Sequence, residues 1–235
     1  MFAQFGPALA ALAAVGLTGV SLRDLLRSIL RWRVAPGWYA VAVPVGLIAV
    51  QTALYGLLGN PVDLASVPGR VTGFLPTALM LTLIAGLGEE PGWRGFALPR
   101  LQSGLAPVAA TLVLGGVWAV WHLPLVFVDP RFSHGFTSAA APQVLLALLT
   151  MITITLNAFF YTWLYNRTGS VLLCALLHGG FNASIGLFPA SLDLLQRWVY
   201  VSLLVVQCAT LLVAVAALVA ATRGTLGYGA KGSDA

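Results

Sequence analysis

The chain consists largely of long hydrophobic stretches separated by short polar connections. A helix needs about 20 apolar residues to cross the hydrocarbon core of a bilayer, and seven stretches reach that length. They are continuous rather than alternating with polar residues, which indicates helices and disfavours a β-barrel. The pattern predicts an all-α protein, a polytopic transmembrane bundle of about seven spans. The predicted spans cover residues 2–20, 38–58, 72–91, 107–127, 143–165, 170–188 and 198–221.

One polar connection has a helical pattern of its own. After the first predicted span, arginines recur every four residues at Arg23, Arg27 and Arg31, and leucines fill the opposite side. Ser21 stands at a position where its hydroxyl can cap the start of a helix. We therefore expect an amphipathic helix over residues 21–33 that lies in the membrane interface.

The composition leaves no room for a separate soluble domain. Only 8% of the residues are charged and 59% are hydrophobic, whereas soluble domains average about 25% charged residues. We expect residues 1–223 to form a single transmembrane domain whose motif-bearing core covers residues 70–190. The glycine-rich, charged end at residues 224–235 predicts a flexible cytoplasmic tail.

The positive charges predict an orientation. The formal net charge is +5, and alternation of the predicted spans puts nine of the 12 Lys and Arg residues on one side of the membrane. Cytoplasmic loops carry the excess of Lys and Arg, so we expect an outside N-terminus and a cytoplasmic C-terminus. The basic charge is thereby explained by topology, and no nucleic-acid partner is expected.

Two adjacent carboxylates interrupt the third predicted span. Glu89 and Glu90 are the only glutamates of the chain. A charge at the centre of a membrane helix costs roughly 2.5–3.5 kcal/mol on insertion scales and marks a functional site by default. Arg94 follows Glu90 by four residues, so the two can form an ion pair on one helix face. Pro91 is expected to kink the helix directly after the carboxylates.

Three more polar groups lie inside predicted spans. His122 is in the fourth span, and His178 and Asn182 share one face of the sixth span, one turn apart. Counting residues from the inner loops puts Glu90 and His122 at comparable depth and His178 at about half that depth. Kinks or tilts must absorb this difference. We expect one polar site made of Glu89, Glu90, Arg94, His122, His178 and Asn182.

These residue types support two kinds of hydrolytic chemistry. A carboxylate and an imidazole can activate a water molecule, and imidazole and amide N–H groups can stabilise the oxyanion that forms at a carbonyl. On this hypothesis Glu89 is the base, His178 is its partner, and His122 and Asn182 stabilise the oxyanion. Two histidines and a glutamate are also a zinc ligand set, so Glu89, His122 and His178 are candidate metal ligands. The helical HExxH motif of zinc proteases is not in the sequence.

At these residues the chain resembles the CAAX-protease and bacteriocin-processing family (CPBP, also called Abi). The family pattern is EExxxR, then FxxxH, then HxxxN or HxxxD. Glu89 to Arg94 match the first motif, and His178 to Asn182 match the third. The second motif departs at one position, because Trp118 stands where the family has phenylalanine. The resemblance covers at least residues 70–190.

The resemblance implies an intramembrane endopeptidase in which the first glutamate of the pair is the water-activating base. It implies eight spans, one more than the hydrophobic pattern predicts. The expected partners are the lipid bilayer and a membrane-associated peptide or protein substrate. The expected location is a bacterial plasma membrane, since the strings around residues 95–102 and 163–169 look typical of bacterial members.

Other functions use the same polar groups. One is a zinc-dependent metalloprotease, and another is a non-proteolytic bacteriocin-immunity or binding protein that holds a peptide or lipid in the same cavity. A proton relay or transporter is a third, but such proteins often carry internal repeats with paired broken helices, and the sequence shows no repeat.

Overall fold

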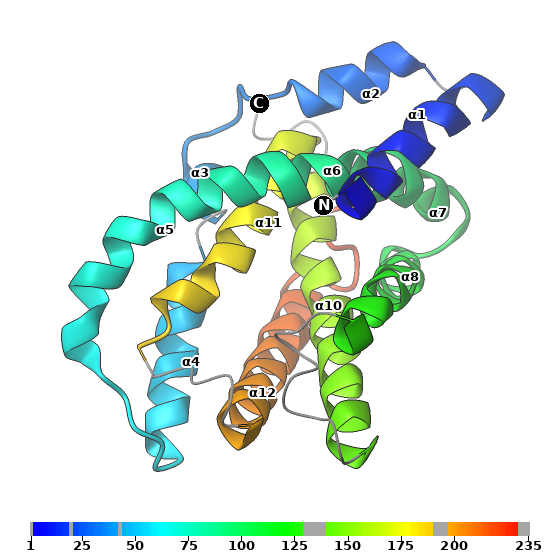
Figure 1. Cartoon of the computed structure of the whole chain (residues 1–235). Helices are drawn as coiled ribbons and strands as arrows, with labels where there is room; N and C mark the ends of the chain where they lie inside the picture. The colour runs from blue at the N-terminus through cyan, green and yellow to red at the C-terminus, as the bar shows by residue number, and fades with distance from the viewer. Residues whose placement is uncertain (1, 19–20, 42–43, 129–139, 190–196, 230–235) are drawn as a thin grey trace.

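The computed structural model is a bundle of helices (Figure 1) and describes residues 2–18, 21–41, 44–128, 140–189 and 197–229. These residues contain helices, turns and bends but no β-strand. The prediction of an all-α protein is therefore confirmed. Residues 230–235 of the predicted tail lie outside the described residues.

The α-helices differ greatly in length. Three of them, α5 to α7, form one continuous helical stretch together with two π-helical segments. The α-helices are α1 (Gly6–Thr18), α2 (Leu22–Ile29), α3 (Gly37–Val41), α4 (Val45–Leu57), α5 (Val67–Leu81), α6 (Leu87–Glu90), α7 (Leu98–Gly104), α8 (Pro107–Val128), α10 (Ala140–Thr168), α11 (Val171–Ser184) and α12 (Arg197–Ala221). The π-helical segments are η3 (Thr82–Gly86) and η4 (Pro91–Ala97). Short 3-10 turns are η1 (Phe2–Phe5), η2 (Leu64–Ser66) and η5 (Ile185–Leu187).

The apolar helices follow the predicted spans closely. Within the described residues, five helices are long and apolar enough to cross a membrane, and two more apolar helices are shorter. The five are Gly37–Leu57, Leu64–Gly104, Pro107–Leu125, Val144–Thr168 and Val201–Ala221, and the shorter two are Gly6–Thr18 and Val171–Leu187. Each corresponds to one predicted span, so the protein is a polytopic transmembrane bundle.

The third span differs from its prediction. The apolar pattern predicts a span over residues 72–91 whose helix continues to about residue 101, before a turn at Ser103 and Gly104. The continuous helical segment ends at Gly104 as this predicts, but it begins earlier, at Leu64, and has 41 residues. The segments η3 and η4 bracket the four residues of α6, which include both glutamates. Figure 1 shows this segment crossing the upper part of the bundle obliquely, at a steep angle to α10 and α12. π-Helical turns frequently occur at functional sites.

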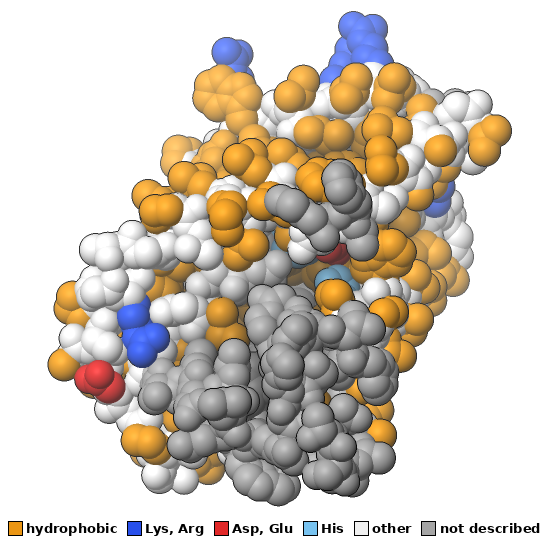
Figure 2. Space-filling model, viewed as in Figure 1, with side chains coloured by type: hydrophobic (Ala, Val, Ile, Leu, Met, Phe, Trp, Pro, Cys, Tyr) orange, Lys and Arg blue, Asp and Glu red, His pale blue; other side chains and the backbone are white. Residues whose placement is uncertain are grey.

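The amphipathic helix after the first span is present as α2. The Ser21 hydroxyl accepts a hydrogen bond from the backbone N–H of Asp24, as a cap does. Leu25 is buried and packs against α1, whereas Arg23 and Arg27 are exposed. Arginine side chains project from the same upper end of the molecule in Figure 2. The predicted helix is thus confirmed, and its place in the interface stays a prediction.

The main hydrophobic core lies between α7, α8, α10 and α11. It is built from apolar side chains with at most 8% exposure, among them two aromatic residues that also border the polar site described below. Its buried members are Leu98, Leu114, Trp118, Ala158, Tyr161, Leu164, Tyr165, Val171, Leu173, Cys174 and Leu177.

Glycines allow α11 to pack backbone to backbone against η3. A Cβ atom on Gly86 would lie 2.5 Å from the carbonyl oxygen of Ala175, and one on Gly179 would collide with Thr82. Small residues permit such close helix contacts in membranes. This approach brings α11, and with it His178, next to the segment that carries the glutamates.

The described residues after α12 fold back on the bundle. The side-chain amide of Asn166 donates to the carbonyl of Leu226 at 3.1 Å, and Leu226 is fully buried. The flexible tail was predicted from residue 224, whereas residues 224–229 form turns packed against α10.

Candidate active site

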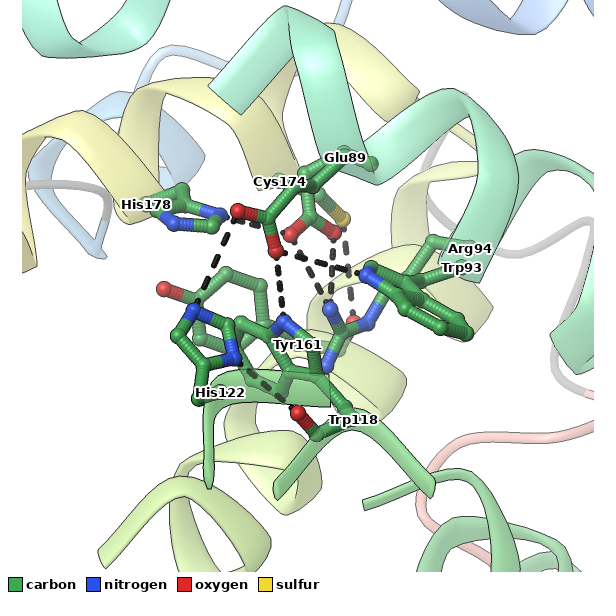
Figure 3. A network of polar contacts seen from close by, with 9 residues as sticks. Glu89, Trp93, Arg94, Trp118, His122, Tyr161, Cys174 and His178 are labelled. Carbon is green, nitrogen blue, oxygen red and sulfur yellow. Dashed lines mark hydrogen bonds and ion pairs between the residues drawn. The ribbon is translucent and has the colours of Figure 1, made fainter. Parts of the chain in front are cut away.

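The structure brings five of the six predicted site residues into one polar cluster (Figure 3). Glu89 and Glu90 come from α6, Arg94 from η4, His122 from α8 and His178 from α11. Glu89, Glu90, Arg94 and His178 are at most 2% exposed. Charged groups buried in this way must be paired, because burying an isolated charge is costly.

Glu90 is the centre of a buried ion network. The Nη1 atom of Arg94 lies 3.0 Å from each carboxylate oxygen of Glu90, which confirms the ion pair expected from their spacing. The Nδ1 atom of His178 lies 2.8 Å from Oε1 of Glu90. The carboxylate of Glu90 is therefore held by two partners.

Arg94 is held between two aromatic rings. Its guanidinium carbon lies 4.4 Å from the ring centroid of Trp118 and 4.4 Å from that of Tyr161. The Nε and Nη2 atoms are buried without a hydrogen-bond partner among the described residues. Contacts with aromatic faces stabilise a desolvated cation, so the two rings partly replace the missing hydrogen bonds.

The two carboxylate oxygens of Glu89 have different neighbours. The indole N–H of Trp118 donates to Oε2 at 2.6 Å, and the indole of Trp93 donates to the same oxygen at 3.4 Å. The other oxygen, Oε1, faces Nε2 of His122 at 3.9 Å. The carboxylate is thus held through one oxygen while the second oxygen faces an imidazole.

His122 has a defined hydrogen-bonding state. Its Nδ1 atom lies 3.0 Å from the carbonyl oxygen of Trp118, and a carbonyl can only accept, so Nδ1 carries the hydrogen. In the neutral ring Nε2 then has the lone pair. The 3.9 Å between Nε2 and Glu89 exceeds a direct hydrogen bond, and a bridging water suits such a separation.

This part of the site is the accessible one. The side chain of His122 is 21% exposed, whereas that of His178 is 3% exposed. Figure 2 shows an acidic side chain next to a histidine in a hollow of the surface, bordered by hydrophobic side chains. A substrate or water would therefore meet Glu89 and His122 first.

The pairing of glutamates with histidines differs from the sequence hypothesis. We expected His178 to be the partner of Glu89, but His178 contacts Glu90, and His122 is the histidine next to Glu89. Neighbouring side chains on a helix point about 100° apart. Glu90 consequently points towards α11 and Glu89 towards α8, a choice that spacing along the chain does not reveal.

Asn182 is the predicted residue that stands apart. Its side chain is exposed, and no hydrogen bond joins it to the other five site residues as the structure describes them. It lies one turn beyond His178, towards the end of α11. Its part in the site stays a prediction.

Three aromatic residues at the site were not predicted to have a role there. Trp93 and Trp118 donate to Glu89, and Tyr161 packs on Arg94 and within 5.9 Å of the His178 ring. The sequence carried one signal, which was the tryptophan at the phenylalanine position of the second motif.

The three candidate zinc ligands do not form one ligand set. In the parts of the chain that are described, no group of three or more His, Cys, Asp or Glu side chains is arranged to hold a metal ion. Glu89 faces His122, while His178 contacts Glu90. The residues as placed do not fit a zinc site, and metal dependence stays a question for measurement.

Comparison with known proteins locates the similarity in the region of the site. A family model described as Type II CAAX prenyl endopeptidase Rce1-like matches residues 71–184. CAAX prenyl protease 2 from Methanococcus maripaludis is 32% identical over 124 residues, which is 52% of this chain and 44% of that protein. The matched region thus spans less than half the length of this curated relative. Residues 71–184, which match the family model, contain all six predicted site residues.

Proposed function

Because residues 71–184 match the Rce1-like family of CAAX prenyl endopeptidases, we propose that this chain is an intramembrane endopeptidase that hydrolyses peptide bonds of membrane-associated substrates. The observation that carries the proposal is the arrangement of Glu89 and His122. An oriented carboxylate oxygen and an imidazole lone pair face each other across 3.9 Å. Two such acceptors can bind and activate one water molecule between them.

The reaction proposed for this arrangement is direct attack by water. Oε1 of Glu89 accepts a proton from a water molecule whose second hydrogen is held by Nε2 of His122. The water oxygen forms a bond to the carbonyl carbon of the scissile peptide, and the carbonyl oxygen becomes an oxyanion. When the C–N bond breaks, the proton on Glu89 passes to the leaving nitrogen. The carboxylate is thereby regenerated.

The ion network around Glu90 supports this chemistry by balancing the charge next to Glu89. Two adjacent carboxylates repel each other in a site of low dielectric constant. Arg94 offsets one of the two negative charges at 3.0 Å, and His178 holds the same carboxylate at 2.8 Å. We assign Glu90, Arg94 and His178 to positioning and charge balance, and Glu89 and His122 to the reacting water.

The substrate belongs to the proposal as well. The curated relative is named a prenyl protease, and a lipidated peptide would reach the site from within the bilayer. We propose that the enzyme resides in the plasma membrane with its C-terminus in the cytoplasm, as the positive charges predict. Its substrate is then a peptide or protein anchored in the cytoplasmic leaflet.

The test is peptide cleavage by the purified protein in proteoliposomes. The probe is a farnesylated peptide ending in a CAAX sequence, and the same peptide without farnesyl is the control for lipid recognition. Glu89→Gln keeps the shape of the side chain and removes its basicity, so cleavage should fall at least 100-fold, as the loss of a general base predicts. Asp63→Asn, which changes an exposed carboxylate far along the chain, should cleave normally. Undiminished cleavage by Glu89→Gln would refute the proposal.

A further inference from the structure

Trp118 contacts nearly every member of the polar cluster. Its indole N–H lies 2.6 Å from Oε2 of Glu89, and its carbonyl oxygen lies 3.0 Å from Nδ1 of His122. Its ring packs on Arg94 at 4.4 Å and forms a T-shaped contact with the His178 ring, with centroids 5.6 Å apart. The residue is 4% exposed, so packing holds its ring in one position.

The bond between Trp118 and Glu89 restricts the carboxylate to one orientation. The indole nitrogen can only donate, and a hydrogen bond to an ionised acceptor is shorter and about twice as strong as a neutral one. Since Oε2 is occupied by this donor, Oε1 is the oxygen that faces His122. Trp93 also reaches Oε2, but at 3.4 Å its contribution is weaker.

Trp118 also contacts His122, the second residue of the proposed water site. Its carbonyl oxygen accepts the hydrogen of Nδ1 of His122, which leaves Nε2 as the acceptor that faces Glu89. One residue therefore sets both the reactive oxygen of Glu89 and the tautomer of His122. A phenylalanine at this position would keep the carbonyl but would have no side-chain donor for Glu89.

We propose that Trp118 is a positioning residue whose indole N–H aligns Glu89 with the water that it activates. This inference rests on the proposed function, because it takes Glu89 to be the base. It assigns the tryptophan of the second motif a polar role that the phenylalanine of the family pattern cannot have. Positioning of this kind acts on the chemical step rather than on binding of the substrate.

The first arm of the test does not depend on activity. The indole groups are labelled with 15N in the protein in nanodiscs, and Trp118→Phe identifies the indole N–H signal of this residue by its disappearance. Glu89→Ala removes the acceptor, so the proton signal of Trp118 should move upfield by more than that of Trp93. Asp63→Ala is the control and should move neither signal. A Trp118 signal that stays in place in Glu89→Ala overturns the proposal.

The second arm measures kinetics in the peptide cleavage assay. Trp118→Phe should lower kcat by roughly tenfold or more, as the loss of a hydrogen bond to a charged group implies, and should leave KM unchanged. Trp93→Phe should lower kcat less, because its bond to Glu89 is longer. Trp32→Phe, an exposed residue outside the site, should have wild-type kinetics. A normal kcat in Trp118→Phe, or a change in KM alone, refutes the positioning role.

The two arms separate failure of this inference from failure of the proposed function. If Glu89→Gln cleaves normally, the proposed function fails, and the positioning role fails with it whatever the signal shows. If Glu89→Gln is inactive but Trp118→Phe is fully active, only the positioning role fails. If Trp118→Phe does not fold, the Trp118 signal is assigned by elimination from single Trp→Phe variants of the other six tryptophans, and its response to Glu89→Ala decides whether the hydrogen bond exists.

Discussion

Both carboxylate oxygens of Glu90 lie 3.0 Å from the same guanidinium nitrogen of Arg94, and neither side chain has any exposed surface. The two residues lie one helical turn apart in the same helical segment. His178 approaches the same carboxylate from α11 at 2.8 Å. The contact between these helices therefore contains a buried polar network, and removing any one of the three groups takes a partner from the others.

Removing the cation of this network should strongly destabilise the protein. Arg94→Met leaves Glu90 buried and deprived of its positive partner, a change that typically costs about 3–5 kcal/mol. The measurement is the free energy of unfolding in detergent or in bicelles. Arg27→Met is the matched control, because Arg27 forms an exposed ion pair with Asp24 at 3.2 Å, and such pairs contribute about 0–1 kcal/mol. Equal losses in the two variants would contradict the buried network.

The two histidines should have different effects when each is replaced. His122→Ala should lower cleavage by about 10²–10⁴-fold, as expected for a general acid–base residue, with little loss of stability because its side chain is partly exposed. His178→Ala should lower the unfolding free energy as well, because it leaves buried Glu90 without one of its partners. The measurements are cleavage rate and unfolding on the same preparations. The reverse pattern would exchange the roles assigned to the two histidines.

Gly86 should be intolerant of even a methyl group. A Cβ atom there would lie 2.5 Å from the carbonyl oxygen and 2.9 Å from the Cα atom of Ala175, so Gly86→Ala must push α11 away from η3. Overpacking of this kind costs typically 1–3 kcal/mol, and cleavage should fall because His178 moves with α11. Gly73→Ala lies on the same long helical segment with no atom within 4 Å of the added Cβ. It should be neutral or slightly stabilising, because alanine favours a helix more than glycine does, and a similar loss in both variants would contradict the close contact at Gly86 as the cause.

The chelator response should distinguish the proposed water mechanism from zinc chemistry. Glu89, His122 and His178 do not come together as a ligand set in the structure. We expect cleavage to persist after metal-free purification and incubation with a chelator. The measurements are zinc content by mass spectrometry and turnover before and after zinc is added back. Loss of turnover that zinc alone restores would favour the metalloprotease alternative.

Much of this architecture could be predicted from the sequence because membrane spans leave a strong hydrophobic signal. The seven apolar helices, the cap at Ser21 and the ion pair of Glu90 with Arg94 all follow from local spacing. Predicting that His122 and His178 belong to the cluster required the sequence motifs as well. These features depend on residues close together in the chain, or on the cost of placing charge in lipid.

The partners of each glutamate could not be predicted in the same way. Whether His122 or His178 faces Glu89 depends on the rotation of three helices about their axes. The π-helical segments on both sides of α6 change that rotation. The sequence predicted a kink only at Pro91, where η4 begins, and no residue pattern indicated η3. The hydrogen bond from Trp118 depends on the same rotation, so the sequence indicated only an aromatic residue near His122.

The oblique course of the third span has a consequence for the membrane around the protein. From Arg70 to Arg100 the segment measures about 45 Å at the usual helical rise, whereas the hydrocarbon core is about 30 Å thick. The segment must therefore incline, and its angle is tied to bilayer thickness through hydrophobic mismatch. Because η4 and α6 carry Arg94 and both glutamates, a thicker or thinner bilayer changes how these residues meet His122. Cleavage in vesicles of graded acyl-chain length should pass through a maximum.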